Sequence, residues 1–171
     1  MASELHVDAI KHSGGTSAMT IDSSGRVLTP SVPCFHVYND SQNFSSTSVS
    51  KWEANVAVIN NGSNFDLSNN RFTAPVAGHY FMAWHALFRN VASGFRVWWY
   101  KNGAINTNPS DTAASDIYVG YPSGHETTGA MSGIFNLSVG DYIEVYYQSG
   151  GAGDIYGDDN MHNGWTGHLI G

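Results

Sequence analysis

The sequence predicts an all-β protein, and three observations support that prediction. Aromatic residues make up 13% of the 171 residues, charged residues only 12%, and glycine occupies 19 positions. This composition is typical of a protein built from strands and turns. No window has the sustained i, i+3, i+4, i+7 apolar spacing of an amphipathic helix. One long segment instead alternates apolar and polar residues with a period of two.

The first 32 residues differ from the remainder and predict a short extended arm in front of a single head domain, residues 33–171. Two short extended pieces surround Asp22-Ser-Ser-Gly25, which is a hairpin turn signal. The arm has too few apolar residues for a core of its own, so it needs a partner to become ordered. A disordered leader is the alternative that its composition allows. The segment Pro30-Ser-Val-Pro33 marks the boundary.

The first half of the head reads as short strands separated by turn-forming residues. Cys34–Tyr38 predicts the first strand, and the lone cysteine in it predicts a buried small hydrophobe, with an interchain or reactive thiol as the alternative. Trp52–Asn60 contains a second strand, and two short pieces flank Ser68–Asn70. A long strand begins at Gly78. Its core face consists of alternate apolar residues: Tyr80, Met82, Trp84, Ala86 and Phe88.

The second half of the head continues this pattern. A strand with Phe95, Val97 and Trp99 on one face leads into an Asn-Gly turn. A hairpin is predicted between Thr127–Leu137 and Tyr142–Gln148, around the turn at 138–141. Long polar or glycine-rich loops are predicted at 106–124 and 149–164, with a short extended piece at 117–119, and the final strand is 165–170.

Four motifs occur in order across residues 33–171. They are Phe65-Asp-x(5)-Phe-Thr-Ala-Pro-x-x-Gly-x-Tyr-Phe81, Lys101-Asn-Gly103, Leu137-x-x-Gly-Asp-x-Ile143 and Trp165-Thr-Gly-His-Leu-Ile170. Together they resemble the C1q/TNF-like globular domain. The resemblance implies a jelly-roll β-sandwich of about eight to ten strands, assembled as a homotrimer. No collagen-like Gly-x-y repeat precedes the head, which argues against a complement-type or secreted-hormone member.

Large apolar side chains occupy both faces of two predicted strands, although one face is enough for a core. Leaving the second set in water would cost about 25 cal/mol per Å². A subunit interface is therefore predicted for that set, and coverage within one subunit by the second sheet and by loops is the alternative. The predicted interface residues are Phe81, Leu87, Trp98 and Tyr100.

Candidate ligand and metal sites lie mainly in the loops. Aromatic rings beside Asn and Asp suit sugar faces, with loop packing as the alternative; these rings are Tyr118, Tyr121, Tyr156 and Trp165. Some family members bind Ca²⁺ in apical loops, so loop acids are candidate ligands, with solvated acids as the alternative; these are Asp154, Asp158 and Asp159. No other cofactor is predicted.

The histidines form neither a His-Glu-x-x-His motif nor a close His-x-His pair. His79, His85 and His168 nevertheless lie in predicted strands that could face a trimer axis. Three symmetric copies of one of them would create a site for a metal ion or an anion. A hydrogen-bonded strand histidine is the alternative.

Composition excludes some functional classes. The formal net charge is −7, and the seven Lys and Arg residues are scattered, so no nucleic-acid partner is expected. No stretch is long enough to insert into a membrane. No Gly-x-Ser-x-Gly motif is present, and Asp116 and Glu126 are the sole candidates for a glycosidase-like carboxylate pair, so the protein is predicted not to be an enzyme.

The arm resembles the stalk or attachment segments that precede receptor-binding heads in bacteriophage tail fibres and other virion appendages. The start, Met-Ala-Ser-Glu-Leu-His, lacks the features of a secretory signal peptide. We therefore expect a homotrimeric virion surface protein made in the host cytoplasm, serving as tail fibre, head fibre or capsid decoration. Its arm would bind other virion proteins and its head a host receptor or glycan. The alternatives are a stand-alone C1q-like adhesin or lectin of a cell, and a polysaccharide depolymerase.

Overall fold

The computed structural model describes residues 6–40, 43, 46–90, 94–106, 116–119, 126–151, 153–158 and 161–171. These residues form β-strands, turns and extended segments, with no helix among them, so the predicted all-β class is confirmed. The chain divides into two compact units, residues 1–32 and 33–171. Within the described part of the chain, no helix has the length and apolarity needed to cross a membrane.

The arm is a small antiparallel sheet of β1 (Ala9–Lys11), β2 (Ser17–Ile21) and β3 (Val27–Leu28). The predicted hairpin at Asp22 is confirmed: its Oδ1 accepts the backbone N–H groups of Ser24 at 2.9 Å and Arg26 at 3.0 Å. Gly25 supplies the left-handed turn position with φ of 78°. The hydrogen bond from the Arg26 backbone is the main reason that the pKa of Asp22 is lowered.

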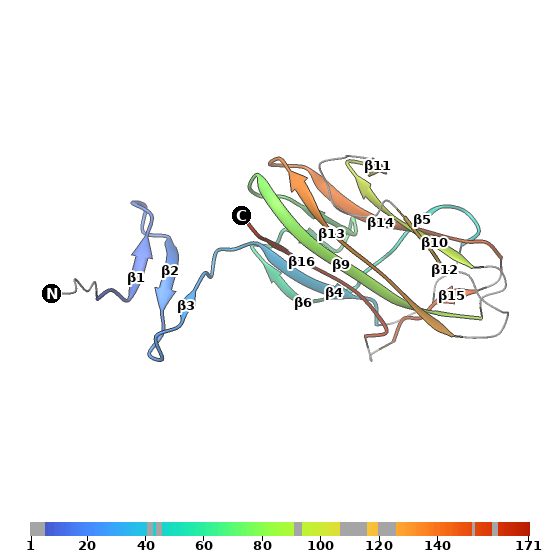
Figure 1. Ribbon diagram of the computed structural model, residues 1–171, viewed down its shortest axis with the longest axis horizontal. Coiled ribbons are helices and arrows are strands. Elements are labelled where there is room, and N and C mark those ends of the chain that lie inside the picture. The colour runs from blue at the N-terminus through green and yellow to red at the C-terminus, as the bar shows by residue number, and fades with distance from the viewer. Residues whose placement is uncertain are drawn as a thin grey trace. The chain divides into compact units, whose positions relative to one another are not determined.

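The described residues of the head form two antiparallel sheets (Figure 1). The six-stranded sheet has the order β13 (Thr127–Leu137), β9 (Gly78–Arg89), β16 (Asn163–Leu169), β4 (Cys34–Tyr38), β6 (Val56–Asn61), with β15 (Asp154–Ile155) also paired to β9. The seven-stranded sheet has the order β11 (Ala104–Ile105), β10 (Phe95–Lys101), β14 (Tyr142–Ser149), β8 (Arg71–Thr73), β7 (Phe65–Asp66). In addition, β12 (Asp116–Val119) pairs with β10, and β5 (Ser50–Lys51) pairs with β14.

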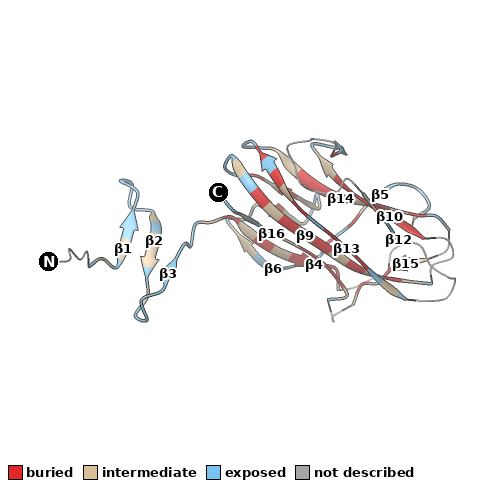
Figure 2. Ribbon diagram, viewed as in Figure 1, coloured by how far each residue is buried: buried red, intermediate tan, exposed pale blue. Residues whose placement is uncertain are grey.

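The core lies between these two sheets and is built from alternate residues. Burial alternates along β9, as Figure 2 shows, and its predicted inner residues are at most 1% exposed. The opposite sheet contributes alternate residues of β10 and β14, so the predicted faces of both strands are confirmed. These residues are Phe95, Val97, Trp99, Ile143, Val145 and Tyr147.

Aromatic rings dominate the centre of this core. The Trp165 ring lies edge-on to Phe35 and Phe65, each at a centroid distance of 5.2 Å. It also packs against Trp99 of the other sheet at 5.7 Å. Edge-to-face pairs add to the stabilisation that burial provides, so Trp165 links the two sheets.

The predicted hairpin between Thr127–Leu137 and Tyr142–Gln148 is wrong. The turn is present, with the Asp141 N–H donating to Ser138 O at 3.0 Å. However, β13 pairs with β9 in one sheet, whereas β14 pairs with β10 in the other. Two successive alternating strands can send their apolar residues into one core from opposite sides. The period of two therefore predicted each strand but not its partner.

Candidate functional site

Histidines gather on the outer face of the six-stranded sheet, which we call the histidine face. Its five histidines come from four places in the chain, and they occupy positions that alternate with buried residues. They are His36 of β4, His79 and His85 of β9, His168 of β16, and His162 immediately before β16. The chain has eight histidines, so more than half of them share this surface.

A groove of about 330 Å³ lies in this face. Its floor contains small side chains because Ser132, Ala83 and Thr166 lie side by side on β13, β9 and β16. Larger side chains line its walls, namely His36, Phe81 and His85. We call this feature the histidine groove.

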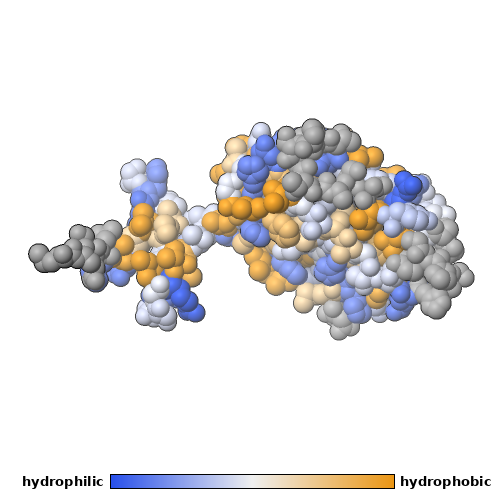
Figure 3. Space-filling model, viewed as in Figure 1, coloured by the Kyte–Doolittle hydropathy of each residue, from blue (hydrophilic) through white to orange (hydrophobic). Residues whose placement is uncertain are grey.

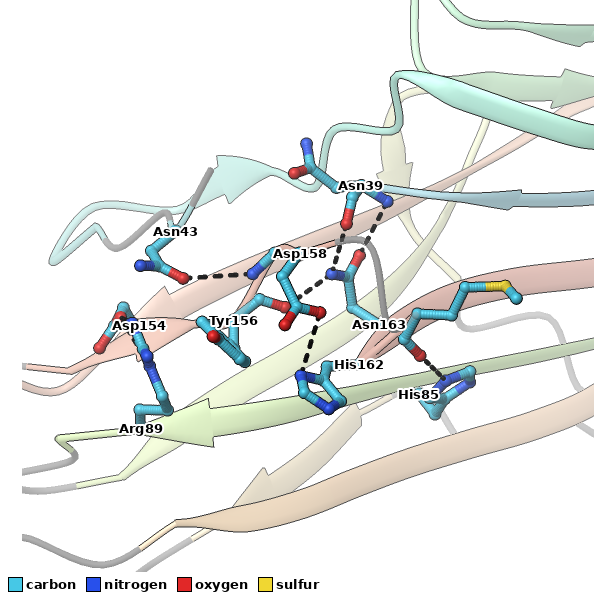
Figure 4. A network of polar contacts seen from close by, with 11 residues as sticks. Asn39, Asn43, His85, Arg89, Asp154, Tyr156, Asp158, His162 and Asn163 are labelled. Carbon is cyan, nitrogen blue, oxygen red and sulfur yellow. Dashed lines mark hydrogen bonds and ion pairs between the residues drawn. The ribbon is translucent and has the colours of Figure 1, made fainter. Parts of the chain in front are cut away.

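A glycine makes room for one ring of the histidine groove, and burial lowers the pKa of another. A Cβ on Gly164 would lie 3.1 Å from His85 Cε1, so the glycine leaves space for that ring. The Nε2 atom of His85, which is labelled in Figure 4, lies 3.4 Å from the Met161 carbonyl oxygen. Burial, assisted by the charge of His85, lowers the pKa of His36. The neutral form of the His36 imidazole is therefore favoured at neutral pH.

A buried asparagine, which no sequence motif indicated, fixes the loop next to this face. Asn163 is fully buried, and its Nδ2 donates to the carbonyl oxygens of Asn39 at 3.1 Å and Tyr156 at 2.7 Å. Its Oδ1 accepts the Asn39 N–H at 3.2 Å (Figure 4). One side chain thus satisfies backbone groups from two distant segments.

Two of the three acids predicted as Ca²⁺ ligands have partners within the chain. Asp154 pairs with Arg89, Nη2 to Oδ2 at 2.9 Å, and also accepts from Asn90 at 3.2 Å. Asp158 Oδ1 lies 3.1 Å from His162 Nδ1. Asp159 lies outside the described residues. Among the residues that are described, no three His, Cys, Asp or Glu side chains group as metal ligands.

The four predicted ligand aromatics are not equivalent. Trp165 is wrong as a surface residue, because it is fully buried at the centre of the core. The Arg89 guanidinium lies over the Tyr156 ring, 3.8 Å from its centroid, and His162 stacks on that ring at 5.0 Å. Tyr118 on β12 is 62% exposed. Tyr121 lies outside the described residues.

The four predicted interface residues divide between opposite outer faces of the sandwich. Phe81 and Leu87 are half-buried on the histidine face. Trp98 and Tyr100 lie on the outer face of the seven-stranded sheet, where Trp98 is only 9% exposed within the subunit. They therefore cannot belong to one flat surface.

Two other predictions also concern these surfaces. Cys34 is half-buried on the histidine face, opposite His168, so it is less buried than the predicted small core hydrophobe. It lies at an outward position of β4, since Phe35 and Val37 take the inward ones. The candidate carboxylates Asp116 and Glu126 lie in β12 and just before β13.

The fold is similar to known structures, although no protein-family model matches the chain. The globular domain of zebrafish complement 1qA protein is 16% identical with a TM-score of 0.52, covering 82% of this chain and 98% of that one. Murine APRIL, in a crystal structure at pH 5.0, is 14% identical with a TM-score of 0.62, covering 81% and 99%. The head thus has the C1q/TNF-like jelly-roll fold that its motifs predicted.

Proposed function

We propose that this chain is a non-enzymatic, homotrimeric display protein of a particle surface, of the kind found on bacteriophage virions. The N-terminal arm attaches it to other particle proteins, and the jelly-roll head faces outward. One observation carries the proposal: the arm is a separate folded unit whose apolar side chains have no core to enter.

The arm exposes a large part of its apolar surface (Figure 3). Val27 is 56% exposed, Ile10 49% and Leu28 47%. A sheet of 3, 5 and 2 residues is marginal on its own. Contact with a partner would remove this surface from water and stabilise the arm at about 25 cal/mol per Å². These features support an attachment or assembly role for the arm.

The histidine face supports self-association of the head. Its groove is bordered by the half-buried Phe81, and small side chains let a neighbouring chain approach closely. A cyclic trimer would bring three copies of this face toward one axis. The face is therefore our candidate for the subunit interface.

Mass measurement in native buffer tests the assembly. We expect a particle of three times the 18.5 kDa subunit mass for the full chain. A single-subunit mass across micromolar concentrations would contradict the trimer.

Electron microscopy tests the display role. Antibody against the head should label purified particles from the producing cells. Replacing Val27 and Leu28 with Asp should abolish that labelling, whereas Val139→Asp, at a head residue with 67% exposure in the turn before β14, should preserve it. Head protein found only in particle-free extracellular fractions would instead favour the stand-alone adhesin.

A further inference from the structure

A second groove, of about 390 Å³, lies on the outer surface of the seven-stranded sheet, away from the histidine face. It combines a charged side chain, Arg96, with an exposed aromatic ring, Tyr118. The lining residues that matter here are Gly94, Arg96, Tyr118 and Gln148, with Thr47 at the rim. We call it the Arg96–Tyr118 groove.

Strand register brings its three principal side chains into one row. Arg96 on β10 pairs with Tyr118 on β12 and with Gln148 on β14. Side chains opposite each other on adjacent antiparallel strands have Cβ atoms about 4.5–5.5 Å apart. The neighbouring residues Phe95 and Val97 point into the core, so the row faces outward.

The Tyr118 ring is positioned despite its 62% exposure. Its hydroxyl lies over Gly94, where an added Cβ would come within 2.8 Å of Oη. Gly94 also has φ of 100°, which favours glycine. The Arg96 guanidinium lies 5.7 Å from the ring centroid, within cation–π range. An aromatic face is thus held next to a cation at the surface.

The Gln148 amide is also held in position. The Gln148 Nε2 donates to the Thr47 carbonyl oxygen at 2.8 Å, which holds the amide at the groove. Among the described residues that line the groove, Arg96 is the sole charged side chain. The groove therefore offers a planar cation, an apolar ring face and an amide within one small hollow.

We propose that the Arg96–Tyr118 groove binds an acidic sugar residue of a surface polysaccharide or glycan. The Arg96 guanidinium pairs with the sugar carboxylate, because its paired N–H groups match two carboxylate oxygens. The Tyr118 ring contacts the apolar face of the sugar, and the Gln148 amide hydrogen-bonds to hydroxyls. This inference gives the displayed head of the proposed function a ligand class, but its test does not depend on assembly.

Isothermal titration of the full-length protein separates the sources of a sugar carboxylate. The probes are trigalacturonic acid, which contains hexuronic acids, and sialyllactose, which contains a nonulosonic acid. Neutral galactotriose and lactose are their matched controls. Binding of either acidic probe in preference to its neutral control supports the proposal. Equal binding of acidic and neutral probes, or binding of neither acid, would overturn it.

Three variants test the assigned roles. Arg96→Gln should weaken binding of the acidic probe by about tenfold to 100-fold, as expected for loss of a hydrogen bond to a charged group. Arg96→Lys should restore part of that affinity. Tyr118→Ala should weaken acidic and neutral probes alike, because the ring contacts the sugar rather than its charge.

Arg26→Gln is the matched control, since it removes an exposed cation in the arm, where the Arg26 side chain is 75% exposed. Its affinity should equal that of the unmodified protein. Unchanged affinity in Arg96→Gln, with thermal unfolding also unchanged, would refute the assignment. Such a result would leave the mass and labelling experiments on trimeric display unaffected.

Discussion

The two outer faces of the sandwich use their large side chains in different ways. On the seven-stranded sheet, the Tyr100 ring stacks on Tyr146 at 4.1 Å, and the Arg71 guanidinium lies over the Tyr142 ring at 4.6 Å. The buried Glu144 carboxylate pairs with the Lys51 ammonium group. On the histidine face, small side chains and imidazoles surround a hollow instead.

This difference is the basis on which we propose the histidine face as the surface that contacts another chain. On the seven-stranded sheet, Trp98 is only 9% exposed and Tyr100 stacks on Tyr146 within the same subunit, as the alternative interpretation of these two residues allowed, whereas Tyr118 stays exposed. The groove beside Phe81 has no comparable cover among the described residues. Large aromatic residues on an outer face are therefore a weak guide to a subunit interface, because neighbours within the same subunit can cover their rings.

The largest effect should come from the core that both faces share. Trp165→Ala removes the ring that contacts Phe35, Phe65 and Trp99, and should lower the free energy of unfolding by about 3–5 kcal/mol. Chemical denaturation monitored by tryptophan fluorescence measures the loss. A variant with unchanged stability would contradict the burial of Trp165 and revive its assignment as a ligand residue.

Next in size is an arginine placed on the histidine face. Ala83→Arg puts bulk and like charges from each copy into the groove, and should weaken self-association on the order of 100-fold, since facing like charges cost several kcal/mol. Sedimentation equilibrium measures it. Ala104→Arg, at an exposed residue of β11, is the matched control and should associate normally. If Ala104→Arg dissociated the assembly and Ala83→Arg did not, the interface would lie on the seven-stranded sheet instead.

The ion pair of the seven-stranded face should have an intermediate effect. Lys51→Met leaves the Glu144 carboxylate, only 5% exposed, without its cation and should cost about 1–3 kcal/mol of stability. Lys11→Met, at an exposed arm residue, should cost almost nothing. Thermal unfolding of both variants is the measurement, and an equal response would mean that the pair does not stabilise this face.

The smallest effect is a pH dependence of the histidine face. The folded pKa of His36 lies below its usual 6.5, so the unfolded chain binds the proton more readily. The contribution of neutral His36 to stability is complete above its usual pKa of 6.5, and it is lost as the pH falls through the pKa of His36 in the folded protein. The titratable group whose charge acts on His36 is His85. The midpoint temperature of thermal unfolding should fall less between about pH 7.5 and 5.5 in His36→Gln than in the unmodified protein. An identical fall in both proteins would exclude His36 as the cause of the pH dependence.

Local patterns determined much of this protein. The period of two along residues 78–89 assigned every inner residue of β9, and Asp22-Ser-Ser-Gly25 and Lys101-Asn-Gly103 identified their turns. Such features depend on side-chain direction and backbone conformation, which neighbouring residues set. The four motifs likewise identified the C1q/TNF-like fold, which the structural comparisons confirm.

Tertiary structure alone decided which segments meet. It sent β13 and β14 to different sheets, and it gathered histidines from separate strands on one face. It also buried Trp165 and aligned Arg96 with Tyr118 and Gln148. Alternation specifies which side of a strand enters the core, whereas pairing depends on how the complete set of strands fills that core. A site whose residues come from several strands therefore cannot be predicted until the strand pairing and register are known.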